Sequence, residues 1–173
     1  MDLAQLAEKY GEIQMVSKKS SVFSQGAPNE YIYAVLEGVL KAYYLSEDGK
    51  EYIKSFLVSG DSIASLQALN GGTCSFGLLG ITDCKLLRLP YKKLREMTSN
   101  SLEPSNAVID LLMKFAMKKE QREYELLCLS AEQRLNNLIQ RMPDIYDMVT
   151  QNDIARYLGI TPVALSRIKH LKK

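Results

Sequence analysis

The side chains best suited to a specific chemistry lie near the end of this sequence, in a segment predicted to be a helix. Four of them have the i, i+3, i+4, i+7 spacing that places side chains on one helix face: Val163, Ser166, Arg167 and His170. An arginine guanidinium can donate two parallel hydrogen bonds to O6 and N7 of guanine, and a serine hydroxyl can bond a base edge or a phosphate. The pattern therefore predicts a helix face suited to the major groove of DNA.

The residues around this face predict a helix-turn-helix. Thr150 is a natural N-cap for a first helix. Gly159 suits its end, where a left-handed conformation costs least for glycine. Thr161 can cap a second helix, and Pro162 fits its first position. The small core is expected from Ile154, Ala155, Leu158, Ile160, Leu165 and Ile168. The alternative is a helical hairpin that only packs on the rest of the chain, which leaves the basic outer face unexplained.

The distribution of charge agrees with a DNA-facing end. Residues 150–173 hold five Lys or Arg and one Asp, a local charge of +4, so the rest of the chain carries −2 of the total +2. A solvated basic end would give the same balance, but a phosphate-facing end is expected to have it. Lys172 and Lys173 are further candidates for phosphate contacts. The residues predicted to contact DNA are Arg167, Ser166, Val163, Thr161, His170, Lys169 and Gln151.

The composition argues against an enzyme, a metalloprotein and a membrane protein. His170 is the sole histidine, and the three cysteines lack the spacing of a metal site or a disulfide framework. A roll-based enzyme of the cupin type needs several histidine or carboxylate ligands inside its barrel, so we predict no enzymatic activity and no metal or other cofactor. No apolar run spans a bilayer, and the first residues lack the pattern of a signal peptide, so a cytoplasmic protein is expected.

Short apolar runs separated by glycine indicate β structure in the first half of the chain. Gly26, Gly38, Gly49 and Gly60 mark turns, and the Asp-Gly pair at 48–49 predicts a hairpin loop. The expected strands are Tyr31–Leu36, Val39–Leu45, Glu51–Val58, Phe76–Thr82 and Lys85–Leu89. Strands at this spacing predict an antiparallel, jelly-roll-like β-roll over residues 1–100, with helices at 2–10 and 91–97.

The second half reads as helical, which makes the chain an α+β protein. A helix over 105–129, within a unit 101–129, has an apolar stripe formed by Val108, Leu111, Leu112, Phe115 and Ala116. The stripe can cover the roll alone, or it can also pair with its copy in a homodimer, which we favour. Ser130 and Gln133 predict a capping box that begins the next helix, which Pro143 ends before a linker at 144–149. The helix-turn-helix unit is assigned to 130–173.

This order of elements resembles the CRP/FNR family of bacterial transcription regulators over nearly the whole chain. The stretches that carry the resemblance are residues 22–26 (VFSQG), 31–38 (YIYAVLEG), 46–51 (SEDGKE), 60–61 (GD) and 166–167 (SR). The resemblance implies a cyclic-nucleotide-binding-type sensor roll, a homodimer formed through the long helix, and binding to double-stranded DNA. RNA polymerase is then an expected partner. The alternative is a signalling or scaffold module of the same fold without DNA binding.

The chain departs from the family pattern in ways that change the expected ligand. Family members that bind cyclic AMP use a Glu for the ribose and an Arg for the phosphate, where this chain has Ser65 and Ser75. Weak or absent cyclic AMP binding is therefore predicted, and an unidentified effector has the candidate pocket residues Ser65, Leu66, Leu69, Ser75 and Phe76. The cysteine group of the iron–sulfur branch is absent before Cys74, and Val163 stands where the recognition helix usually has Glu. Three residues follow the last helix, so most or all of the family's β-hairpin wing is expected to be missing.

Overall fold

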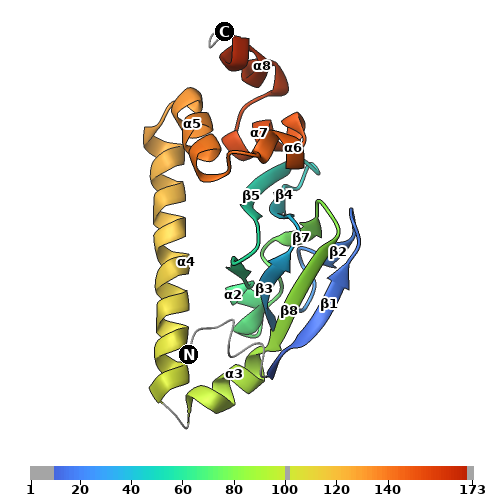
Figure 1. The fold of residues 1–173 in the computed structure, drawn as a ribbon, viewed down its shortest axis with the longest axis vertical. Coiled ribbons are helices and arrows are strands. Elements are labelled where there is room, and N and C mark those ends of the chain that lie inside the picture. Colours follow the sequence, from blue (N-terminus) through green and yellow to red (C-terminus); the bar gives the residue numbers. More distant parts are fainter. Residues whose placement is uncertain (1–9, 100–101, 171–173) are drawn as a thin grey trace.

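The computed structural model describes residues 10–99 and 102–170. A β-roll, a long helix along one side of it and a group of helices at one end follow each other in the chain (Figure 1). The expected helix over 2–10 lies, apart from Tyr10, outside the described residues, as do Lys172 and Lys173.

The roll consists of two four-stranded antiparallel sheets, as the sequence predicted. One sheet has the order β1 (Glu12–Val16), β8 (Cys84–Pro90), β3 (Tyr31–Glu37), β6 (Ser62–Ile63). The other has the order β2 (Ser21–Phe23), β7 (Gly77–Gly80), β4 (Leu40–Leu45), β5 (Glu51–Leu57). Their inner faces share one core, which includes Phe23, Tyr33, Leu40, Leu78 and Leu86. All five expected strands are present. Strands β1, β2 and β6 were not predicted, since β2 and β6 are very short and most of β1 is not buried.

The hairpin between β4 and β5 turns where the Asp-Gly pair predicted. Gly49 has a φ of 77°, and its amide donates to the Ser46 carbonyl at 2.9 Å. Glycine adopts this conformation without a steric penalty.

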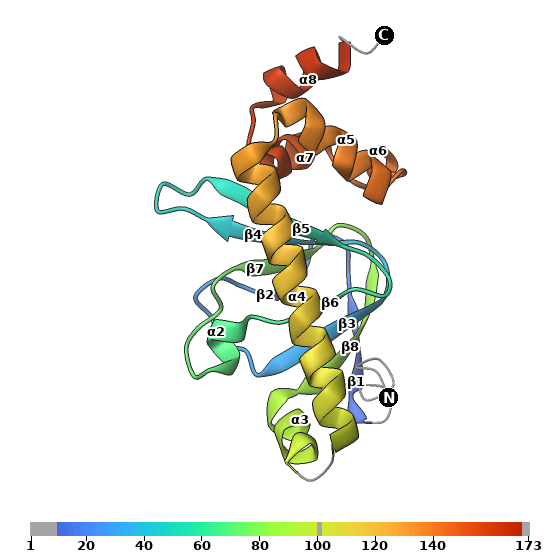
Figure 2. The same ribbon diagram turned by 90° about the vertical axis from the view of Figure 1, so that its left-hand side faces the viewer.

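Helix α4 (Leu102–Cys128) runs along the roll and packs on the outer face of the first sheet together with α3 (Tyr91–Thr98) (Figure 2). Leu111 is buried there, and Val108 and Phe115 are partly buried against the same cluster. Within the predicted stripe, Val108 and Phe115 therefore cover the roll and do not provide the surface for pairing with a copy. Leu112 remains exposed.

The remaining helices are α2 (Leu66–Leu69), α5 (Ala131–Arg141), α6 (Ile145–Met148), α7 (Gln151–Leu158) and α8 (Pro162–His170). The capping box of α5 is confirmed, since Ser130 Oγ accepts from Gln133 N at 3.2 Å and Ser130 N donates to Gln133 Oε1 at 2.9 Å. The segment predicted to be a linker contains α6 instead. Ile145 is fully buried in α6, so this segment is part of the core.

Candidate nucleic-acid interface

Helices α7 and α8 form a helix-turn-helix in which the predicted caps are confirmed. Thr150 Oγ1 accepts a hydrogen bond from Asp153 N at 3.1 Å at the start of α7. Gly159 follows α7 in the left-handed conformation with a φ of 70°. Thr161 Oγ1 accepts from Ala164 N at 3.2 Å, and α8 begins at Pro162. Each cap satisfies backbone groups that a helix end leaves without an intrahelical partner.

A small apolar core holds the two helices together. Ile154, Ala155 and Leu158 of α7 and Leu165 of α8 are completely buried. Ile160 in the turn and Ile168 of α8 are partly buried against them. The opposite side of α8 therefore faces outward.

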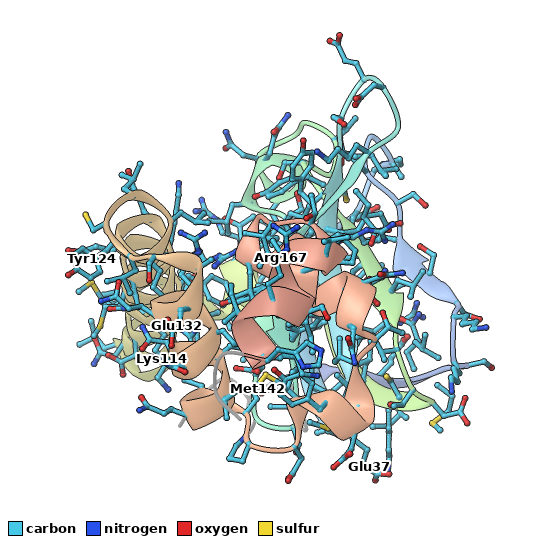
Figure 3. The ribbon with its side chains drawn as sticks, turned by 90° about the horizontal axis from the view of Figure 1, so that it is seen from above. Glu37, Lys114, Tyr124, Glu132, Met142 and Arg167 are labelled. Carbon is cyan, nitrogen blue, oxygen red and sulfur yellow. The ribbon has the colours of Figure 1, made fainter. Side chains whose placement is uncertain are left out.

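The four residues predicted to share a face do so and line one open hollow on α8: Val163, Ser166, Arg167 and His170. The side chain of Val163 is 63% exposed, and Arg167 makes no ion pair with the part of the chain that the structure describes. This face lies at the end of the molecule opposite α3 (Figure 1), and Figure 3 looks onto that end with Arg167 labelled on α8. This face is therefore accessible to solvent at one end of the molecule.

The other residues of the predicted DNA-binding set surround this face unevenly. Gln151 and Thr161 are exposed at the starts of α7 and α8. The Lys169 side chain extends toward α6, where its Nζ is 4.2 Å from the centroid of the Tyr146 ring. Lys169 does not line the hollow with the other four residues of α8.

An ion network that no local sequence pattern predicted joins α7 to the roll. Lys41 of β4 donates from Nζ to Glu51 Oε1 at 2.7 Å and to Asp153 Oδ1 at 3.1 Å. Arg156 donates to the same Glu51 oxygen at 3.1 Å. Each residue reads as an ordinary surface charge in the sequence, and only the contact between β5 and α7 brings them together.

A second buried charge, Glu125, joins the long helix to α5. Its side chain is 1% exposed and lies 3.2 Å from Arg141 NH1 and 3.8 Å from Arg122 NH1. Asn137 Nδ2 donates to it at 3.4 Å. Partners of this kind are what a buried carboxylate needs to remain charged.

Ser65 and Ser75, which stand where the resemblance expects a charged pair, are hydrogen-bonded to each other. Ser65 is fully buried, and its Oγ accepts a hydrogen bond from Ser75 N at 3.2 Å. Next to them, Phe76 lies in the roll interior at 5.4 Å from the Phe23 ring. Lys54 Nζ is 4.9 Å from the centroid of the Phe76 ring, and burial, together with the charge of Lys119, lowers the pKa of Lys54.

The structure places the five candidate effector residues in two sets. The Ser65 hydroxyl is hydrogen-bonded to Ser75 N, and Phe76 belongs to the core of the roll. Leu66 and Leu69 lie on α2 and line a cavity beside α4. The single turn of α2 separates the two sets, since it points its leucines away from the roll interior.

Within residues 10–99 and 102–170, no group of three or more His, Cys, Asp or Glu is placed to hold a metal ion. Over the same residues, no helix is both long enough and apolar enough to cross a membrane.

Comparison with known proteins gives a consistent result. The model of the family "Cyclic nucleotide-binding domain" matches residues 13–101. The anaerobic regulatory protein of Pasteurella multocida is 28% identical over 165 residues, which cover 88% of this chain and 60% of that protein. The regulatory protein HlyX of Actinobacillus pleuropneumoniae is 27% identical, covering 96% and 74%. The chain thus spans about three fifths of the length of the Pasteurella relative.

Solved structures show the same fold. FixK2 of Bradyrhizobium japonicum superposes with a TM-score of 0.78 at 20% identity, covering 93% of this chain and 83% of that one. The c-di-GMP responsive regulator CLP of Xanthomonas campestris gives 0.76 at 18% identity, with coverages of 98% and 90%. The chain belongs to the cyclic nucleotide-binding domain family. The relatives are named as regulatory proteins, and the fold is shared with solved regulators, in line with the sequence resemblance.

Proposed function

We propose that this protein is a transcription regulator that binds double-stranded DNA through α8. The observation that carries the proposal is the open face of Val163, Ser166, Arg167 and His170 on the second helix of a helix-turn-helix. In such modules the second helix enters the major groove. The relatives support the proposal, because the Pasteurella multocida and Actinobacillus pleuropneumoniae proteins are both named as regulatory proteins.

We further propose that the active form is a homodimer in which α4 pairs with α4 of a second copy. The stripe of α4 that does not contact the roll is apolar and exposed: Ile109, Met113, Met117, Tyr124 and Leu127. These residues lie on the side of the helix opposite the buried Ala107 and Leu111. Figure 3 shows Tyr124 at the outer margin of α4, away from the roll. A twofold dimer would suit a palindromic DNA site, with one α8 in each half.

Several expectations from the sequence remain proposals of the same kind. We propose RNA polymerase as a partner, an unidentified small molecule as the effector, a location in the cytoplasm and no enzymatic activity. The division into a sensor roll, a dimerisation helix and a DNA-binding unit also remains a proposal. The network of Lys41, Glu51 and Asp153 supports the idea that the first and last of these units move as one body.

Selection of bound sequences from a random DNA pool tests the proposed function directly. We expect the wild type to enrich a palindromic sequence whose half-sites are about 10 base pairs apart, one turn of the duplex. The Arg167→Ala variant, with an intact fold by circular dichroism, should enrich a sequence that is less specific in each half-site. Failure of the wild type to enrich any sequence, with and without cell extract, would support the signalling or scaffold alternative.

A further inference from the structure

A cavity of about 190 Å³ lies between the roll and the long helix, and neither Ser65 nor Ser75 lines it. Its walls come from α2, α3, α4 and β3, and no side chain that lines it is charged. Asn70 and Tyr91 supply the only polar side chains among its lining residues. A cavity of about 150 Å³ with apolar walls is large enough to hold a benzene ring.

The mouth of this cavity is formed by leucines that the fold leaves open to solvent. Leu66 of α2 is 51% exposed and Leu112 of α4 is 45% exposed, while Ala64 and Leu111 deeper inside are buried. An entry path with apolar sides and an interior without charge favours a ligand that loses little hydration on binding. The same features disfavour an anion such as a cyclic nucleotide, because no lining residue could pair with its charge.

We infer that this cavity is a binding site for a small, uncharged, mainly apolar molecule of about the size of one aromatic ring. A ligand there would contact α2 and α4 at once. Since α4 is the helix proposed to form the dimer, the ligand would act on the arrangement of that helix against the roll. This regulatory role rests on the proposed function, whereas binding itself does not and is measured without DNA.

Isothermal titration calorimetry with phenol tests the inference. Benzoate, which has the same aromatic ring but carries a negative charge, is the control ligand. For the wild type we expect saturable phenol binding with a Kd of about 1 mM, a value reasonable for so few ligand atoms, and at least tenfold weaker binding of benzoate. Absence of saturable phenol binding, or equal affinity for benzoate, would overturn the inference.

Two variants locate the site, and a third controls for surface effects. Leu66→Trp blocks the mouth at an exposed position where the fold tolerates bulk, and Ala64→Leu fills the cavity from inside. Both should weaken phenol binding about tenfold or more. Leu45→Trp, at a comparably exposed leucine in the β4–β5 hairpin, should bind phenol like the wild type. Unchanged binding by Leu66→Trp would overturn the inference, even if Ala64→Leu failed to fold.

Discussion

The guanidinium of Arg122 lies over the ring of Tyr157, with its central carbon 3.9 Å from the ring centroid. Arg122 also donates a hydrogen bond to the Tyr157 carbonyl. On the same ring, Phe56 of β5 packs at a centroid distance of 5.3 Å. One side chain of α7 is thus in contact with the roll and with the long helix, and this sets the position of the helix-turn-helix on the molecule.

Removing the Tyr157 ring should therefore detach α7 from both neighbours. For Tyr157→Ala we expect the free energy of unfolding to fall by about 3 kcal/mol, the cost of emptying a buried aromatic site. Tyr157→Phe keeps the ring and loses only the bond between the hydroxyl and Arg141, so it should cost about 1 kcal/mol. Urea denaturation measures both, with the exposed Tyr52→Ala on β5 as the control. An equal loss for Tyr157→Ala and Tyr52→Ala would contradict the assignment.

Glu125 gives a second test of the junction between α4 and α5. Glu125→Gln removes the charge at a site where Arg122 and Arg141 depend on it, so we expect a loss of about 3 kcal/mol in the free energy of unfolding. Glu123→Gln changes an exposed residue nearby and should have almost no effect. The double variant Glu125→Gln, Arg141→Gln should lose less than the sum of the two single changes. Strict additivity would show that the pair does not interact.

Local rules predicted the elements well, and contacts between distant segments were beyond them. The caps at Thr150, Ser130 and Thr161, and the left-handed Gly159, follow from the residue type and its neighbours in sequence. The face of α8 follows from its helical spacing alone. In contrast, the ion network of Lys41 joins residues more than 100 positions apart, and no local pattern indicates such a pair.

The direction in which a helix face points depends on the same kind of contact. Periodicity identified an apolar stripe on α4, but which part of it covers the roll depends on how the helix lies on the sheet. Likewise, the candidate effector residues are close together in sequence, yet one turn of α2 directs Leu66 and Leu69 to the α4 side. The sequence therefore predicted an apolar face on α4 and a set of candidate ligand residues. Where that face and those residues lie in the molecule could be seen only in the folded structure.

Cyclic AMP should bind weakly or not at all. Ser65 and Ser75 stand where the resemblance implies the charged pair of cyclic AMP binders, and the Ser65 hydroxyl accepts a hydrogen bond from Ser75 N. Each lost charge-assisted hydrogen bond should cost about 1.5–3 kcal/mol, which lowers the affinity about tenfold or more. Titration calorimetry with cyclic AMP measures this, and a Kd in the micromolar range would contradict it.

Disruption of the open stripe of α4 should weaken dimerisation without unfolding the protein. Met117→Asp places a charge on the exposed stripe, so we expect dimerisation to weaken about tenfold or more, because the carboxylate would lose its hydration in the interface. Phe115→Asp should also lower the free energy of unfolding, since Phe115 packs against the roll. Sedimentation velocity with Lys114→Ala as the control separates the two effects. A wild type that is monomeric at concentrations of tens of micromolar would refute the dimer.

The specificity of DNA binding should depend chiefly on Arg167. Its guanidinium is exposed on the shared face of α8, so it can reach the bases of the major groove. Arg167→Ala loses the bidentate contact to guanine, so discrimination between bases at one base pair should fall by about 1–3 kcal/mol. Arg167→Lys should lose as much discrimination, because an ammonium lacks the planar pair of donors.

A change at a phosphate contact should behave differently from a change at Arg167. Lys172→Ala should weaken binding to all sequences alike and reduce the slope of log affinity against log salt by about 0.9. Fluorescence anisotropy with the selected DNA site and with random DNA, at several salt concentrations, distinguishes the two effects. If Arg167→Ala kept the wild-type ratio of the two affinities, Arg167 would not read the bases. The assignment of this face of α8 to the major groove would then be wrong, since no other residue on it offers two parallel donors to guanine.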